Sequence, residues 1–285
     1  FATVNRLDDG TLEMTIALPW DAIAAEYHTV VEEMAKETEL PGFRKGKAPK
    51  DLVEQNLNAN KVYEEVIKHL IPKAYGQAVQ DLKLSPFISP AIELKDAKEG
   101  KEWVVLCRTC EKPVVTLGDY KKAVREVKDA KANKIWIPGT QPEDKEKEEK
   151  EKKPTLDELL TALFGAVPIT LPKPLVDHEV NRLLSELVDQ TQKLGLTVDQ
   201  YLGSTQRTPE SIRKEYEEQA KKTLTLEFAL EKIAEEEHIT VTDEELATII
   251  NTAKSEDEKK ALERERYYLA SIVRRQKTID AVAAL

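Results

Sequence analysis

The stretch DGTLEMTIAL, residues 9–18, decides the fold of the first part of this 285-residue chain. Asp9-Gly10 is a hairpin signal, because glycine adopts the positive φ angles that tight two-residue turns require. Beyond the turn, apolar residues alternate with polar or small ones, as they do in a strand with one buried face. The apolar positions are Leu12, Met14, Ile16 and Leu18. We therefore predict two short strands over residues 1–18, the second ended by Pro19.

The pattern changes to helical spacing directly after this hairpin. A helix is expected from Asp21 to about Glu37, then helices near 49–55 and 62–82, with Pro72 bending or interrupting the last. Alternation returns in a second pair of strands, over 91–94 and 102–108, joined near Glu99-Gly100. The order strand-strand, helices, strand-strand is that of an α+β domain.

From Pro154 onward the chain carries helical patterns and no convincing strand alternation. Proline and glycine mark the ends of the expected helices, and Thr242 with Glu245 forms a capping box that opens one of them. The expected helices span 156–164, 175–194, 209–237, a segment from 243, and 257–284. The apolar stripe of the last one is Leu262, Leu269, Ile272, Ile279 and Val282.

A run of almost pure Glu and Lys, Glu143–Lys153, lies between Pro142 and Pro154. Such a segment cannot bury a core, so it is interpreted as a linker, partly helical if Glu and Lys pair along it. Residues 113–137 before it are transitional, and 120–127 could continue as strand or helix. The predicted domains are 1–112, a connector over 113–153, and a helical domain over 154–285.

Composition narrows the classes of function. Aromatic residues make up 6% and charged residues 34% of the chain, which suits long solvated helices better than one thick core. The net charge of −10 argues against a general polyanion binder, so nucleic acid would have to meet a local basic island. No apolar run reaches the roughly 18 residues of a membrane span. The chain begins at Phe1 without the pattern of a secretory signal peptide.

The two cysteines, Cys107 and Cys110, have the spacing C-x-x-C. Two Cys make only half of a zinc site, and the four His are scattered without ligand-like pairing. The pair follows a segment that is predicted to be a strand, whereas a redox pair belongs at a helix N-terminus. Both are interpreted as plain strand residues, and neither a metal nor a cofactor is expected.

The stretch GFRKGKAP, residues 42–49, is expected to be a loop between helices. It presents one aromatic side chain and three cations, with Arg44 offering a planar fork for phosphate or carboxylate. Phe43 has no obvious core to join, so it could insert into an apolar crevice on a partner. A merely solvated basic loop, with Phe43 folded back on its own helices, is the alternative.

The pattern Gly42-Phe43-Arg44-x-Gly46-Lys47-x-Pro49 resembles the ribosome-binding signature of the trigger factor family. Two later blocks, 171–180 and 229–245, resemble the entry to that family's first arm helix and a later helix end. Together the matched blocks cover roughly the first 110 and the last 120 residues.

The resemblance implies a cytoplasmic chaperone without a membrane partner. Its N-terminal α+β domain would bind ribosomal protein and rRNA beside the exit site. An elongated all-α C-terminal domain would hold nascent or unfolded polypeptides between helical arms, and a homodimer off the ribosome is left open. The implied ribosome-binding residues are Gly42, Phe43, Arg44, Lys45, Gly46, Lys47 and Pro49.

The middle of the chain departs from the family, which usually inserts an FKBP-type prolyl-isomerase domain there. Only about 40 residues are present, much of them Glu and Lys, too few for a curved sheet around an aromatic pocket. We therefore expect a form without that domain and without catalysis. The alternatives are a prolyl isomerase of trigger factor type, a SurA-like periplasmic holdase, and a purely structural helical adaptor.

Overall fold

The computed structural model describes residues 2–37, 43, 52, 56–132, 154–253 and 255–285. It divides into two compact units. The first comprises Phe1–Pro113 with Pro172–Leu175, and the second Val114–Leu171 with Val176–Leu285. The N-terminal unit is α+β and the other is helical, as the sequence predicts.

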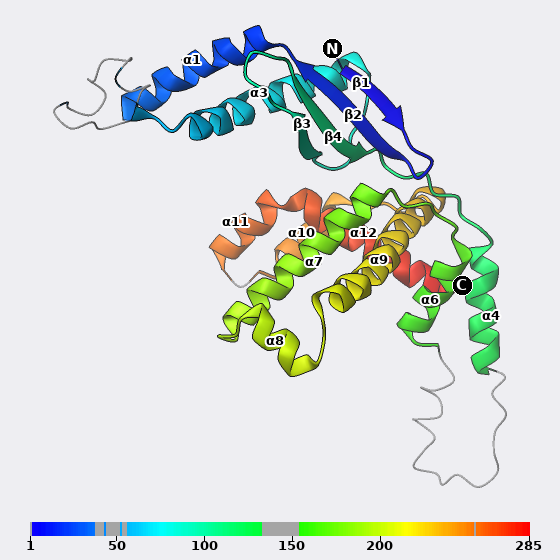
Figure 1. The fold of residues 1–285 in the computed structure, drawn as a ribbon. Coiled ribbons are helices and arrows are strands. Elements are labelled where there is room, and N and C mark those ends of the chain that lie inside the picture. The colour runs from blue at the N-terminus through cyan, green and yellow to red at the C-terminus, as the bar shows by residue number, and fades with distance from the viewer. Residues whose placement is uncertain (1, 38–42, 44–51, 53–55, 133–153, 254) are drawn as a thin grey trace. The chain divides into compact units, whose positions relative to one another are not determined.

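The sheet of the N-terminal unit has the order β1-β2-β4-β3 and is antiparallel throughout. Its strands are β1 (Ala2–Arg6), β2 (Thr11–Leu18), β3 (Ala91–Asp96) and β4 (Trp103–Cys110). Both predicted pairs of strands are therefore confirmed, and Gly10 in the first turn has a φ of +87°. The alternating residues of β2 and β4 place one face of the sheet in the core (Figure 1).

Two helices, α1 (Trp20–Glu37) and α3 (Ala59–Asp81), pack against each other and onto that face. Pro72 lies inside α3, and the helix continues through it rather than being interrupted. The core combines the apolar faces of both helices with those of the two central strands. Its fully buried members are Leu12, Met14, Ile23, Val30, Val62, Val66 and Val105.

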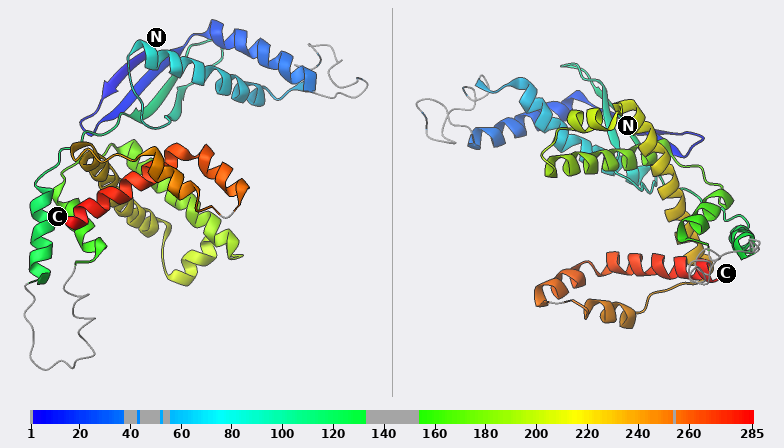
Figure 2. Two further views of the ribbon diagram at one scale, coloured as in Figure 1. Left: turned by 180° about the vertical axis from the view of Figure 1, so that it is seen from behind. Right: turned by 90° about the horizontal axis from the view of Figure 1, so that it is seen from below.

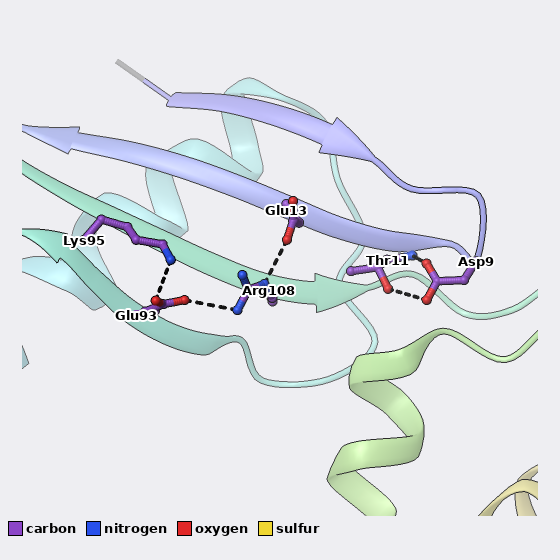
Figure 3. A network of polar contacts seen from close by, with 6 residues as sticks. All are labelled: Asp9, Thr11, Glu13, Glu93, Lys95 and Arg108. Carbon is purple, nitrogen blue, oxygen red and sulfur yellow. Dashed lines mark hydrogen bonds and ion pairs between the residues drawn. The ribbon is translucent and has the colours of Figure 1, made fainter.

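The opposite face of the sheet carries a row of charges. Arg108 on β4 donates to Glu13 on β2 at 2.8 Å and to Glu93 on β3 at 3.1 Å (Figure 3). Lys95 adds a contact of 2.5 Å to Glu93. These side chains are exposed by 28–48%, so each pair contributes little to the free energy of unfolding. The row of charges therefore serves mainly to set the register of β2, β4 and β3, and it adds little to the stability of the sheet.

The first hairpin turn also receives the start of α7 (Lys173–Lys193). The Asp9 carboxylate accepts hydrogen bonds from the Thr11 amide at 2.9 Å, the Thr11 hydroxyl at 2.9 Å and the Lys173 amide at 3.0 Å. Burial alone would raise the pKa of Asp9, but these hydrogen bonds outweigh it and lower the pKa. Asp9 thereby satisfies a backbone donor in the first turn of a helix, as a capping side chain does.

The helical unit contains the elements expected after the linker and one helix that precedes it. They are α4 (Tyr120–Ala132), α6 (Leu156–Ala166), most of α7, α8 (Val198–Thr205), α9 (Pro209–Glu236), α10 (Asp243–Ile250), α11 (Glu256–Arg264) and α12 (Arg266–Ala284). The segment 120–127, for which strand and helix were both open, is helical.

Four of these helices share one core. α4, α6, α9 and α12 bury Tyr120, Val124, Leu159, Leu163, Val167, Ala229, Leu230, Ile233 and Val282 together. The Tyr120 hydroxyl donates to Glu237 at 3.1 Å, just beyond the end of α9. Burial, and then Glu237, raise the pKa of Tyr120 to about 12. The four helices form the base of the unit.

The capping box predicted at Thr242 and Glu245 is confirmed, and Pro209 occupies the first position of α9. One prediction about the helices is wrong, and one helix was not predicted. The helix expected over 257–284 is broken at Glu265, whose φ and ψ of −97° and 22° leave the helical region. α8 was not foreseen, although its capping box of Thr197 and Gln200 follows the rule used for Thr242.

We expect Leu163→Ala to destabilise the helical unit by about 2–5 kcal/mol, because it leaves a cavity in the base. Leu163 is fully buried among the four base helices. Its neighbour Phe164 is 38% exposed, so Phe164→Ala should cost about 1 kcal/mol or less. Urea unfolding followed by circular dichroism measures both. Equal losses for the two variants would contradict the assigned core.

Candidate binding surfaces

The helical hairpin of α1 and α3 is held rigidly against the sheet. Glu26 on α1 meets His69 at 3.0 Å and Lys73 at 3.5 Å, both on α3. The Tyr63 ring packs at a tilt between Tyr27 and Trp103, with ring centroids 5.1 and 5.4 Å apart. The end of α1 and the beginning of α3 project away from the sheet (Figure 1). The two helices that flank the connecting residues are therefore firmly packed on each other.

The predicted ribosome-binding residues belong to this connection. Phe43 is described and is 39% exposed, as is Leu52 nearby in the sequence. The other predicted residues, Gly42, Arg44, Lys45, Gly46, Lys47 and Pro49, lie outside the described residues. Asn58 caps α3 by accepting a hydrogen bond from the Asn60 amide, which fixes where the connection ends.

Two groups of helices extend from the base of the helical unit (Figure 2, right). We call α7, α8 and α9 the first arm and α10, α11 and α12 the second arm. α9 and α12 contact each other within the base. Each group carries exposed large apolar side chains. They are Val188, Leu194 and Leu196 in the first arm, and Tyr267, Tyr268 and Ile272 in the second.

The second arm exposes its apolar side chains most strongly. Tyr267 is 93%, Tyr268 65% and Ile272 47% exposed, and the last two are one helical turn apart. Ile272 belongs to the apolar stripe predicted for the last helix, but the structure leaves it exposed, and the two tyrosines were not singled out from the sequence. Their exposure could have been inferred from the sequence, because the two adjacent tyrosines lie in the charged stretch ERERYYLA, residues 263–270.

Polar contacts hold the later turns of α12 in place. Lys277 meets Glu245 at 2.8 Å and donates to the Thr240 carbonyl at 2.7 Å. Arg274 donates to the carbonyl of Ile239 at 2.8 Å. Arg275 pairs with Glu227 on α9. These contacts tie α12 to α9, to α10 and to the segment before α10.

The cysteines lie on β4, as predicted, and both are buried. Burial raises the pKa of each thiol to about 11. The pKa of a cysteine thiol in the unfolded chain is about 8.5. The contribution of the raised pKa to stability is therefore fully present below pH 8.5 and is lost as the pH rises toward 11. Among the described residues, no group of three or more His, Cys, Asp or Glu side chains could hold a metal ion.

The sequence matches two family models along almost its whole length. The model described as bacterial trigger factor protein matches residues 2–136, and that of its C-terminus matches 141–284. Trigger factors of Staphylococcus epidermidis and Streptococcus suis are 29% and 34% identical over 120 and 122 residues. Those regions are 42% and 41% of this chain, and 28% and 29% of the relatives. The chain thus covers less than a third of these relatives' length.

A solved structure, described as showing promiscuous substrate recognition in folding and assembly activities of the trigger factor chaperone, has the same fold. It aligns over 99% of both chains with a TM-score of 0.61 and 16% identity. A mixed N-terminal unit followed by helical arms is thus an architecture that this chain shares with a solved structure. With both models matched, the chain belongs to the trigger factor family. None of the described helices is long and apolar enough to cross a membrane.

We expect neither cysteine of the native protein to react with a thiol reagent at pH 8. With a pKa of about 11, roughly one thiol in a thousand is ionised at that pH, and burial blocks access as well. Titration with a chromogenic disulfide, before and after unfolding in urea, measures this. Both thiols should react after unfolding. Prompt reaction of either thiol in the native protein would contradict the burial of β4.

Proposed function

We propose that this protein is a ribosome-docked chaperone of the cytoplasm. It would bind nascent or unfolded polypeptides near the exit site without catalysis. The observation that carries the proposal is the exposed Phe43 within the G-F-R-x-G-K-x-P pattern, in the connection between α1 and α3. An exposed aromatic side chain does not stabilise a polar loop, whereas in a docking loop it can anchor the protein to its partner.

The residue types of the loop suit a ribosomal surface. Arg44, Lys45 and Lys47 offer cations to rRNA phosphates, and the forked guanidinium of Arg44 also suits a carboxylate on protein. Phe43 would enter an apolar crevice on ribosomal protein. The packing of Tyr27, Tyr63 and Trp103 supports the role of the hairpin as a stiff mount. Little ordering entropy would then be lost on docking.

The arms would hold the polypeptide. Their exposed apolar side chains, above all Tyr267 and Tyr268, offer contacts to an unfolded segment that has lost its own core. Two separate arms give several weak contacts, so that a client is held but released easily. The acidic balance of the chain would keep such a complex soluble.

The proposal does not include prolyl isomerisation. The two family models leave only residues 137–140 unmatched between them. The isomerase domain that the family usually inserts in the middle of the chain is expected to be absent. A prolyl isomerase of trigger factor type is thereby disfavoured. A SurA-like periplasmic holdase would have no use for the loop around Phe43.

Replacing Phe43, Arg44 and Lys45 by Ala should abolish cosedimentation with ribosomes and leave the fold intact. Wild-type binding should weaken as salt rises, because contacts to phosphate release counterions. The matched control replaces Lys98 and Lys101 by Ala, which removes two exposed cations from the β3–β4 turn instead. If the triple variant still cosediments like the wild type, ribosome docking through this loop is wrong.

Replacing Tyr267, Tyr268 and Ile272 by Ser should reduce suppression of client aggregation, so that at least about twice as much protein is needed. All three are exposed, so stability should change by about 1 kcal/mol or less. Light scattering of an aggregating unfolded protein measures the effect. The control replaces Val114 and Phe164 by Ser, since both are exposed apolar residues outside the arms. Equal activity of the two variants would remove α12 from the client surface.

A further inference from the structure

The second arm contains a cleft where its three helices meet. α10 contacts both α11 and α12, and α11 contacts α12. The break at Glu265 separates the last two helices, so that both can pack against α10. The cleft has a volume of about 390 Å³, more than twice the roughly 150 Å³ of a cavity that binds benzene. It therefore has room for a small organic molecule.

The walls of the cleft combine three kinds of chemistry. α10 and the residue that follows it supply an apolar wall and an amide, α11 a cation and an anion, and α12 a second cation. The lining residues are Ala247, Ile250, Asn251, Lys259, Glu263 and Arg266. A few polar groups beside an apolar wall are typical of sites that orient a small ligand.

The charged side chains of α11 are available to a ligand. Lys259 and Glu263 lie four residues apart on one helix, where opposite charges commonly pair. Within the described part of the chain, however, neither of them forms an ion pair. Both line the cleft instead.

Arg266 is held in place from outside the cleft. Its guanidinium contacts the Asp243 carboxylate at 2.6 Å, and Asp243 does not line the cleft. A guanidinium has five N–H donors, so this contact leaves others for a ligand. Arg266 and Lys259 together offer two cations to one carboxylate.

This mixture of charges disfavours several classes of ligand. A dianion would place its second negative charge near Glu263, which repels it. A neutral apolar molecule would cover Lys259 and Glu263 without satisfying their charges, and this costs free energy. A molecule with one carboxylate, one ammonium and a short apolar body offers a matching group to every wall of the cleft.

We propose that this cleft binds a free aliphatic amino acid of about the size of leucine. Its carboxylate meets Lys259 and Arg266, its ammonium meets Glu263, and its side chain lies against Ile250. The terminal residue of a polypeptide carries only one of the two charges, so it satisfies only part of the site. The inference concerns a ligand other than the ribosome or an unfolded client, and it does not rest on the proposed function.

The experiment titrates the full chain, labelled for nuclear magnetic resonance, with leucine, N-acetyl-leucine and leucine amide. The second probe lacks the ammonium and resembles the C-terminus of a polypeptide, and the third lacks the carboxylate and resembles an N-terminus. Leucine should shift the amide signals of Asn251 and Arg266 in a saturable manner. It should bind at least about threefold more tightly than either other probe, because each of them loses one ion pair.

Three variants test the assigned contacts, two of them against matched controls. Lys259→Gln should weaken leucine binding at least about threefold, whereas Lys260→Gln, at an exposed cation outside the cleft, should not. Glu263→Gln should weaken leucine binding and leave N-acetyl-leucine binding unchanged or improved. Ala247→Leu, which fills the cleft, should abolish leucine binding, unlike Thr248→Leu at the exposed position beside it.

Several results would overturn the amino-acid site. They are the absence of a saturable shift with leucine, or binding of N-acetyl-leucine or leucine amide as tight as that of leucine. Equal binding by a variant and its control, both shown by circular dichroism to be folded, would overturn it as well. Ribosome cosedimentation and suppression of aggregation do not enter these outcomes, so the amino-acid site can fail while the proposed function stands.

Discussion

The helical unit depends on the packing of α9 against α6 and α12. Aromatic residues are few in this chain, so the apolar side chains available for burial are mainly aliphatic and have to be concentrated in one place. α9 supplies much of that concentration through Ala229, Leu230 and Ile233, which meet Leu163 of α6 and Val282 of α12. Because α9 also extends into the first arm and α12 into the second, the same core anchors both. α9 and α12 thus join the two arms where they pack against each other in the base.

Beyond the base, the first arm has a small core of Leu187, Leu202 and Ile212, and the arms are otherwise positioned by local and polar contacts. Capping boxes begin α8, α9 and α10, and cations of α12 reach carboxylates and carbonyls around it. Exposed ion pairs of this kind contribute little energy each. They nevertheless tie each helix to its neighbours, as Lys277 and Arg274 do for α12.

The strands and most helices could be predicted because their signals are local. Asp9-Gly10, the alternation in β2, Pro209 and the box of Thr242 and Glu245 each act within a few residues, and the structure confirms all of them. The break at Glu265 could not be predicted, since no glycine or proline marks it. The exposure of Ile272 was equally inaccessible, because periodicity reports an apolar face but not whether a partner covers it. α8, by contrast, could have been predicted from the capping box of Thr197 and Gln200.

The loop that we propose to contact the ribosome is basic, whereas the chain as a whole is acidic. The chain has 53 acidic and 43 basic residues, yet residues 44–47 place three cations within four positions. At physiological ionic strength, charges further apart than about 8 Å are largely screened. An rRNA phosphate near the loop would therefore be attracted by the cations of the loop. The acidic rest of the chain would repel the phosphate if the protein approached in another orientation.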